Sequence, residues 1–287
     1  MLIDQRRSRP GPGHRITVLG SFSATADGTP VPLGVDAGRA VAYLALHRRP
    51  QRRTDLAADL YPGVPGATAL WLLDEALPAA LTAGLLRDDP DTGTLALDPA
   101  VDVDLDEAMA LVRALTGGAG RPETVPADLA AATALLTADL LPGDDAPWLV
   151  VERERFRQIR LNAIEELSGA LSAAGRHDDA VALAQQAVRT SPSRESARRA
   201  LIEAHLAQGD LAEAVAQYDE YQELLRSSVG AYSGSGLDGL LPPTPAWPVL
   251  RVRRPTQRIG MSPVGLRTGR PAPRRLVSGG SVPGTTR

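Results

Sequence analysis

A repeat with a period of 34 residues constrains the C-terminal half of this chain more than any other feature. Three positions recur at that spacing, namely Leu167, Gly175 and Ala180 in the first copy and Leu201, Gly209 and Ala214 in the second. Apolar residues around them follow a 3.6-residue period, which is typical of helices that bury one face. Glycine lets a helix end in the left-handed conformation, and alanine lets two helices pack closely. The pattern predicts paired helices over residues 163–225.

A repeat of 34 residues that holds two helices has the tetratricopeptide period. Such pairs stack into a curved surface that binds peptides or other domains, so we expect an interaction surface. A structural scaffold without a ligand is the alternative. Two further helices are expected upstream, over residues 105–112 and 127–140, with a Gly/Pro linker at 116–126 between them. Ser191 or Ser193 is expected to cap the third repeat helix.

The N-terminal half has the pattern of strands, three helices and a hairpin. The alternation over residues 15–20 predicts a strand that residues 22–25 continue, and Asp27-Gly28 indicates a hairpin turn. Three helices are expected, over residues 38–47, over 54–60 with Thr54 as N-cap, and over 66–83 with Pro78 as an interior flaw. Residues 85–86 and 95–97 predict a second hairpin. The expected fold class is therefore an α+β winged helix followed by an all-α, tetratricopeptide-like helical repeat domain.

The formal charge of −3 is unevenly divided along the chain. The composition predicts four parts with the following net charges, counted from the sequence: residues 1–14 (+2), 15–104 (−5), 105–241 (−9) and 242–287 (+9). The two middle parts are expected to be the winged-helix domain and the helical domain. The basic ends are rich in Pro and Gly and are expected to be disordered. The C-terminal tail would attract nucleic acid without specificity, stay solvated, or fold back on the acidic body.

Composition also excludes several classes of chemistry. The chain has no Cys, and all 31 of its basic residues are Arg. Disulfides, Cys-ligated zinc, iron–sulfur clusters, Walker-type P-loops and Schiff-base lysines are thereby ruled out. The four histidines have no paired ligand spacing; they are His14, His47, His177 and His205. We therefore expect no enzyme activity, no metal and no cofactor. No apolar stretch approaches 18 residues, so no membrane span is expected and the location is predicted to be cytoplasmic.

Specific motifs in both halves resemble one regulator family. In the N-terminal half these are Ile16-Thr-Val-Leu-Gly, Asp27-Gly-Thr-Pro-Val-Pro-Leu, Asp55-Leu-Ala-Ala-Asp-Leu-Tyr-Pro-Gly and Leu95-Ala-Leu-Asp-Pro-Ala-Val-Asp-Val-Asp. In the C-terminal half they are Leu140-Leu-Pro-Gly, Trp148, Glu152-Arg-Glu-Arg-Phe-Arg-Gln-Ile-Arg-Leu and the paired repeats. Residues 15–225 resemble the SARP-type antibiotic regulatory proteins, which join a winged-helix DNA-binding domain to a bacterial transcriptional activator domain.

The resemblance implies a transcriptional regulator without enzyme activity. The winged helix would bind DNA by placing its third helix in a major groove. The helical repeats would mediate either a homodimer or contacts with RNA polymerase or another protein. No membrane partner is implied.

The third helix departs from the family pattern, in which several Arg face the DNA. No Arg lies between Ala67 and Gly84, and Asp74 stands where a contacting Arg is expected. Acidic side chains repel phosphate, and they accept from cytosine usually only beside Arg neighbours. Candidate DNA contacts are therefore sought in and after the first helix, at Arg39, Arg48, Arg49, Arg52 and Arg53. The alternative is a protein-interaction module that has lost sequence-specific DNA binding.

Two further segments of the helical half allow structural predictions. Arg153, Arg155, Arg157 and Arg160 alternate with acidic residues, which predicts an exposed helix face with ion pairs. Over residues 226–241 a Gly/Ser run replaces the pattern of the family's last helix. We expect that helix to be eroded or reduced to a turn.

Overall fold

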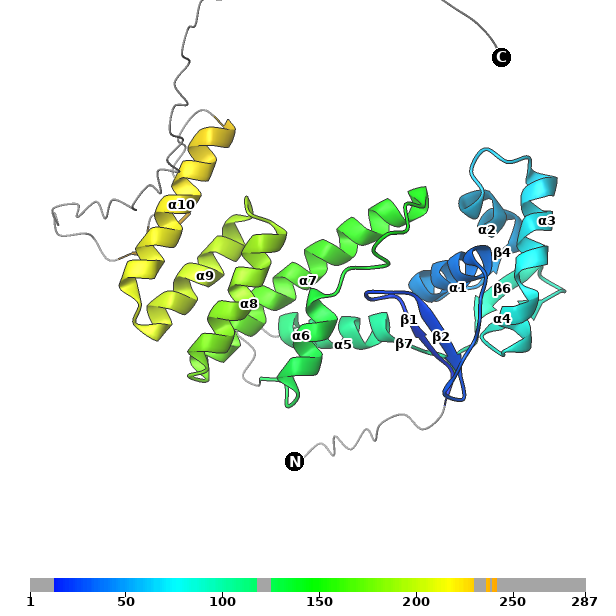
Figure 1. The fold of residues 1–287 in the computed structure, drawn as a ribbon, viewed down its shortest axis with the longest axis horizontal. Helices are drawn as coiled ribbons and strands as arrows, with labels where there is room; N and C mark the ends of the chain where they lie inside the picture. The colour runs from blue at the N-terminus through cyan, green and yellow to red at the C-terminus, as the bar shows by residue number, and fades with distance from the viewer. Residues whose placement is uncertain (1–12, 118–124, 230–235, 238, 242–287) are drawn as a thin grey trace, which may run out of the picture. The chain divides into compact units, whose positions relative to one another are not determined.

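The computed structural model describes residues 13–117, 125–229, 236–237 and 239–241, which are drawn in colour in Figure 1. By its internal contacts the chain divides into two units, residues 1–243 and 244–287, and every described residue lies in the first. The tail expected to be disordered, residues 242–287, lies outside the described residues. So do residues 1–12 of the N-terminal segment and most of the expected linker at 116–126.

A small sheet opens the chain. Its strands are ordered β3-β2-β1-β7. Their bounds are Arg15–Thr17 (β1), Ser23–Ala26 (β2), Thr29–Pro30 (β3) and Asp102–Val103 (β7). Gly20 has a φ of 82°, and the chain reverses there, so that β2 pairs antiparallel with β1 instead of continuing it. The expected continuation over residues 22–25 is therefore wrong. The predicted turn is confirmed, because Asp27 and Gly28 both have positive φ between β2 and β3.

Three helical segments follow, but the third is divided in two. The helices are α1 (Val35–His47), α2 (Arg53–Leu60), α3 (Gly66–Ala76) and α4 (Pro78–Thr82). Pro78 starts α4, where its missing N–H costs least, so it is not an interior flaw. Thr54 is not the N-cap of α2, since Arg52 holds that position and no side chain caps the helix.

A three-stranded sheet completes the winged helix. Its order is β4-β6-β5, with bounds Gln51–Arg52 (β4), Leu86–Asp89 (β5) and Thr94–Leu97 (β6). The hairpin of β5 and β6 is the wing, and Leu86 lies opposite Leu97 in its antiparallel register. The small sheet, three helical segments and the wing confirm the expected α+β half.

The remainder is helical. The helices are α5 (Asp104–Thr116), α6 (Leu129–Thr137), α7 (Pro147–Ala173), α8 (His177–Thr190), α9 (Glu195–Gln208) and α10 (Leu211–Val229). Gly175 and Gly209 have φ values of 76° and 86°, as predicted for helix ends. The repeated alanines, Ala180 and Ala214, are fully buried. The helical class is confirmed, although the expected serine cap is wrong because Arg194 occupies the N-cap of α9.

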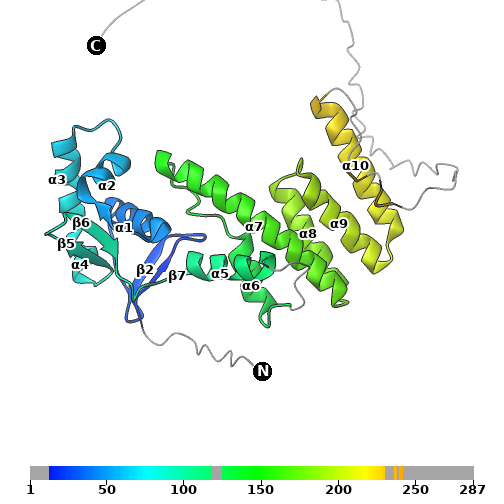
Figure 2. The same ribbon diagram turned by 180° about the vertical axis from the view of Figure 1, so that it is seen from behind.

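The two halves share one hydrophobic core. Leu149 and Phe156 of α7 belong to the same buried cluster as Ile16, Leu44 and Leu97 of the winged helix. A second cluster holds α7 residues 161–171 together with α8. Figures 1 and 2 both show α5 and α6 beside α7. The helix α7 therefore contributes to the cores of both halves.

A buried carboxylate joins the halves by main-chain hydrogen bonds. Asp104 opens α5 and accepts hydrogen bonds from the backbone N–H groups of Val18, at 2.9 Å, and Leu19, at 3.0 Å. Burial raises the pKa of Asp104, and the backbone N–H groups oppose that rise. On the other side of the same strand end, the Gly20 N–H donates to Asp139 O and the Leu141 N–H to Val18 O. The strand end is thus held from both sides.

Two arginines of α7 fasten the turn at residues 138–141. Arg153 donates to the carbonyls of Leu140 and Leu141, and Arg160, only 4% exposed, donates to those of Thr137 and Ala138 and pairs with Asp139. The expectation of an exposed ion-paired face is wrong for these two residues. It is confirmed for Arg157, which pairs with Glu154 at 2.8 Å.

We predict that Asp104→Ala destabilises the chain by about 2–4 kcal/mol, because the buried Val18 N–H and the half-buried Leu19 N–H lose their acceptor. The matched control is Asp106→Ala, whose carboxylate pairs with Arg48 at the surface. That pair is expected to contribute less than about 1 kcal/mol. Urea unfolding of the full chain measures both variants. Equal midpoints for the two would contradict the role given to Asp104.

Candidate nucleic-acid interface

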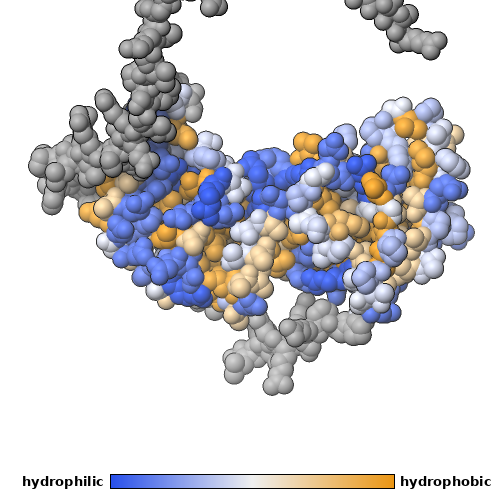
Figure 3. Space-filling model, in the orientation of Figure 1, coloured by the Kyte–Doolittle hydropathy of each residue, from blue (hydrophilic) through white to orange (hydrophobic). Residues whose placement is uncertain are grey.

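The helix α3 is the segment that would read DNA in a winged helix, and its exposed face carries no cation. Ala69 and Leu73 are buried, as is Leu77 just after the helix. The opposite face presents small, aromatic and acidic side chains, which are Ala67, Thr68, Trp71, Asp74 and Glu75. Trp71 is 59% exposed. Figure 3 shows apolar surface among the hydrophilic residues at this end of the chain.

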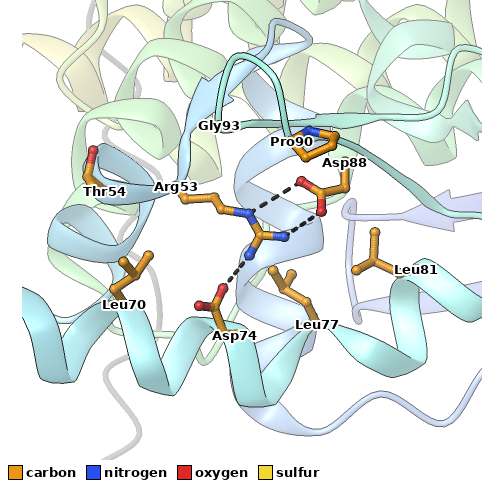
Figure 4. Close-up of a pocket in the computed structure, with 9 residues that line it drawn as sticks. All are labelled: Arg53, Thr54, Leu70, Asp74, Leu77, Leu81, Asp88, Pro90 and Gly93. Carbon is orange, nitrogen blue, oxygen red and sulfur yellow. Dashed lines mark hydrogen bonds and ion pairs between the residues drawn. The ribbon is translucent and has the colours of Figure 1, made fainter.

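Arg53 is the cation nearest to that face, and two carboxylates hold it. Its Nη1 donates to Asp74 of α3, while its Nε and Nη2 donate to the two oxygens of Asp88 in the wing, at 3.3 and 2.8 Å. Figure 4 shows the guanidinium between them, in a pocket of about 600 Å³ bounded by α2, α3 and the wing. Fork-shaped pairing with a carboxylate is among the stronger polar contacts. It ties the N-terminus of α2 to α3 and to β5.

Two more of the candidate cations are engaged within the chain. Arg39 of α1 donates to both oxygens of Asp144, each at 3.1 Å, and lies 3.8 Å from Asp145. The hydrogen bonds to Asp144 raise the pKa of Arg39. Arg48 pairs with Asp106 and donates to the Val101 carbonyl at 3.4 Å. Both arginines therefore link the winged helix to the helical half, and their charges are paired within the chain.

Arg49 and Arg52 are the last two of the candidate DNA contacts. Both are exposed, and neither forms an ion pair with any residue among those described. They flank the turn that leads into α2, with Arg52 in β4. The structure thus brings Arg53 to the α3 face, leaves Arg49 and Arg52 next to α2, and draws Arg39 and Arg48 towards the helical half.

Acidic residues surround these cations. Asp55 and Asp59 are exposed on α2, and Asp89 and Asp91 are exposed at the wing tip. Hydrogen bonds from Thr92 and Asp91 hold the pKa of Asp89 below its usual value, so it stays charged. An array of this sign repels a phosphate backbone. The absence of Arg from α3, expected from the sequence, is thus joined by acidic side chains on α2 and at the wing tip.

Among the described residues, a buried histidine is present but no candidate metal cluster. No group of three or more His, Asp and Glu side chains is placed to hold a metal ion within residues 13–117 and 125–229 or the described residues beyond them. No helix in those ranges is long and apolar enough to cross a membrane. His205 is 5% exposed, and both of its ring nitrogens lack a hydrogen-bond partner in the described structure.

Comparison with known proteins identifies the helical half. Residues 102–240 match the bacterial transcriptional activator domain. The fold is similar to that of Mycobacterium tuberculosis EmbR in complex with a low affinity phosphopeptide, with a TM-score of 0.57 and 21% sequence identity. The likeness covers 77% of this chain, which spans 62% of that protein's length. No curated protein matches the chain.

The match to the activator domain and the shared fold agree with the motifs of both halves. Residues 102–240 therefore resemble a bacterial transcriptional activator domain, and they follow a winged-helix half in a chain whose fold is similar to that of EmbR.

Proposed function

We propose that this chain is a SARP-type transcriptional regulator without enzyme activity, that it acts through protein contacts made by its helical half, and that α3 no longer reads base sequence. The observation that carries the proposal is the engagement of Arg53 by Asp74 and Asp88. This removes the nearest cation from the face that would meet DNA. A location in the cytoplasm, with the transcription machinery, is part of the proposal.

Electrostatics supports the proposal that α3 no longer reads base sequence. Protein–DNA affinity depends on cations that neutralise phosphates, and base-specific contacts add discrimination to that attraction. On α3, Asp74 and Glu75 are exposed without a cation on the same helix. A carboxylate can accept from cytosine N4, but it brings no attraction of its own. The α3 face would therefore weaken an encounter with DNA.

The helical half is the proposed partner surface. Stacked helix pairs present an extended face that other proteins bind. RNA polymerase, another protein or a second copy of the chain are the partners that the activator domain suggests. The phosphopeptide of the EmbR complex implies no such ligand for this chain, which spans only 62% of that protein's length.

Direct DNA binding is the second candidate, and Arg49 and Arg52 favour it. Their exposed guanidinium groups lie beside α2, where they would position a phosphate backbone without reading sequence. Residues 242–287 add nine Arg and no acidic residue. For Arg39, Arg48 and Arg53 to contact DNA, each would have to leave its carboxylate partners.

Asp74→Arg is expected to raise affinity for duplex DNA at least tenfold at low salt. The change places a cation on α3 and frees Arg53 from one of its two partners, so log K against log salt should steepen by about 1. Fluorescence anisotropy with the duplex from upstream of its own gene and a scrambled duplex measures this. Asp178→Arg on α8 makes the same charge change at an exposed site.

The result that would contradict this proposal is also specific. It would be a wild-type chain that prefers the upstream duplex over the scrambled one and loses that preference when Trp71 or Glu75 is replaced by Ala. Base reading by α3 would then be retained.

The double variant Arg49→Ala, Arg52→Ala tests the second candidate. If these side chains meet phosphates, the slope of log K against log salt should fall by about 2. The matched control is Arg155→Ala, which removes an exposed arginine of α7. An unchanged slope in the double variant would assign any DNA binding to another part of the chain.

A further inference from the structure

A short segment returns to cover the last helix pair of the repeat. We call the described residues 236–237 and 239–241 the strap. Leu237 of the strap is fully buried in a cluster with Ile202 of α9 and with Ala214 and Tyr221 of α10. Leu240 and Leu241 pack against the same cluster. This cluster is separate from the two larger cores.

The strap presents its leucines in a single turn. The Leu240 N–H donates to the Leu237 carbonyl at 3.0 Å, so leucines at positions i, i+3 and i+4 face one side. Among the described residues, Arg199 Nη2 donates to the Gly236 carbonyl at 3.0 Å, which adds to the apolar contact. A Cβ on Gly236 would lie 2.5 Å from Glu195 Oε1. A glycine before the first leucine therefore lets the segment approach α9 without displacing the Glu195 carboxylate.

The floor beneath the strap is built by the helices themselves. Tyr221 is 2% exposed, and the Arg198 guanidinium lies 5.9 Å from its ring centre. Arg198, also 2% exposed, donates to Gln217 and Glu220 of α10. These contacts tie α9 to α10 without the strap, and Figure 1 shows the two helices side by side. The apolar surface of α9 and α10 beneath the strap can thus stay folded when the strap is released.

We infer that this α9–α10 groove is a docking site for a partner segment with leucines at i, i+3 and i+4 after a small residue, and that the strap occupies it in cis. An open groove would expose Ile202, Tyr221 and the half-buried Leu224 and Leu225 together. Apolar patches of this kind mark protein interaction sites. A partner that repeats the three leucines competes for the contacts that hold the strap.

The inference deepens the proposed function, because it gives the helical half a specific site and a class of partner. It also supplies regulation, since a groove that is closed most of the time lowers the apparent affinity for any partner by the fraction that is open. The DNA experiments above do not involve this groove. Their outcome and the outcome below are therefore independent.

The test uses the full chain and a fluorescent peptide of residues 234–243 as the probe. Leu237→Asp cannot bury its side chain in the groove and should release the strap. We expect this variant to bind the peptide at least tenfold more tightly than the wild-type chain. Leu211→Asp, at a half-exposed leucine of α10, is the matched control and should behave as wild type. A peptide with its three leucines replaced by Ala should not bind.

Two results would overturn the inference. One is equal peptide affinity for wild type and Leu237→Asp. The other is loss of α9–α10 helix in the Leu237→Asp chain, measured by amide hydrogen exchange, which would make the strap a part of the core and not a ligand of it.

Discussion

The hydrogen bonds at the end of β1 hold the two halves of this chain together. Val18 and Leu19 donate to the Asp104 carboxylate on one side, and Val18 accepts from Leu141 on the other. Asp104 and Val18 are buried there, so their polar groups depend on partners within the chain. The placement of α5 and of the turn before α7 follows from this strand end, and the shared core closes around it.

Local patterns were enough to predict much of this fold. Gly175 and Gly209 end their helices in the left-handed conformation, and Asp27-Gly28 forms its turn, because these effects involve neighbouring residues only. Pro78 shows the limit of such reasoning. Its position in an apolar period predicted one flawed helix, whereas the chain ends α3 before it and begins α4 with it. A helix boundary costs less than an interior proline.

The candidate interface was harder to predict, because its charges pair over long separations. Arg39 and Asp144 lie 105 positions apart, and Arg53 and Asp88 lie 35 apart. Nothing in the sequence near either arginine indicates that its charge is engaged. Arg153 and Arg160 are similar, since the carbonyls that they bind belong to a turn that precedes α7. The absence of Arg from α3, by contrast, is visible directly in the sequence.

The length of α7 has a mechanical consequence. Its 27 residues span about 40 Å, and they supply side chains to the winged-helix core at one end and to the repeat core at the other. Such a helix bends little along its axis. A force that tilts its repeat end therefore also displaces its other end, which packs in the core shared with α1. Because α7 belongs to both cores, the stiffness of this one helix sets how closely a displacement of one half follows a displacement of the other.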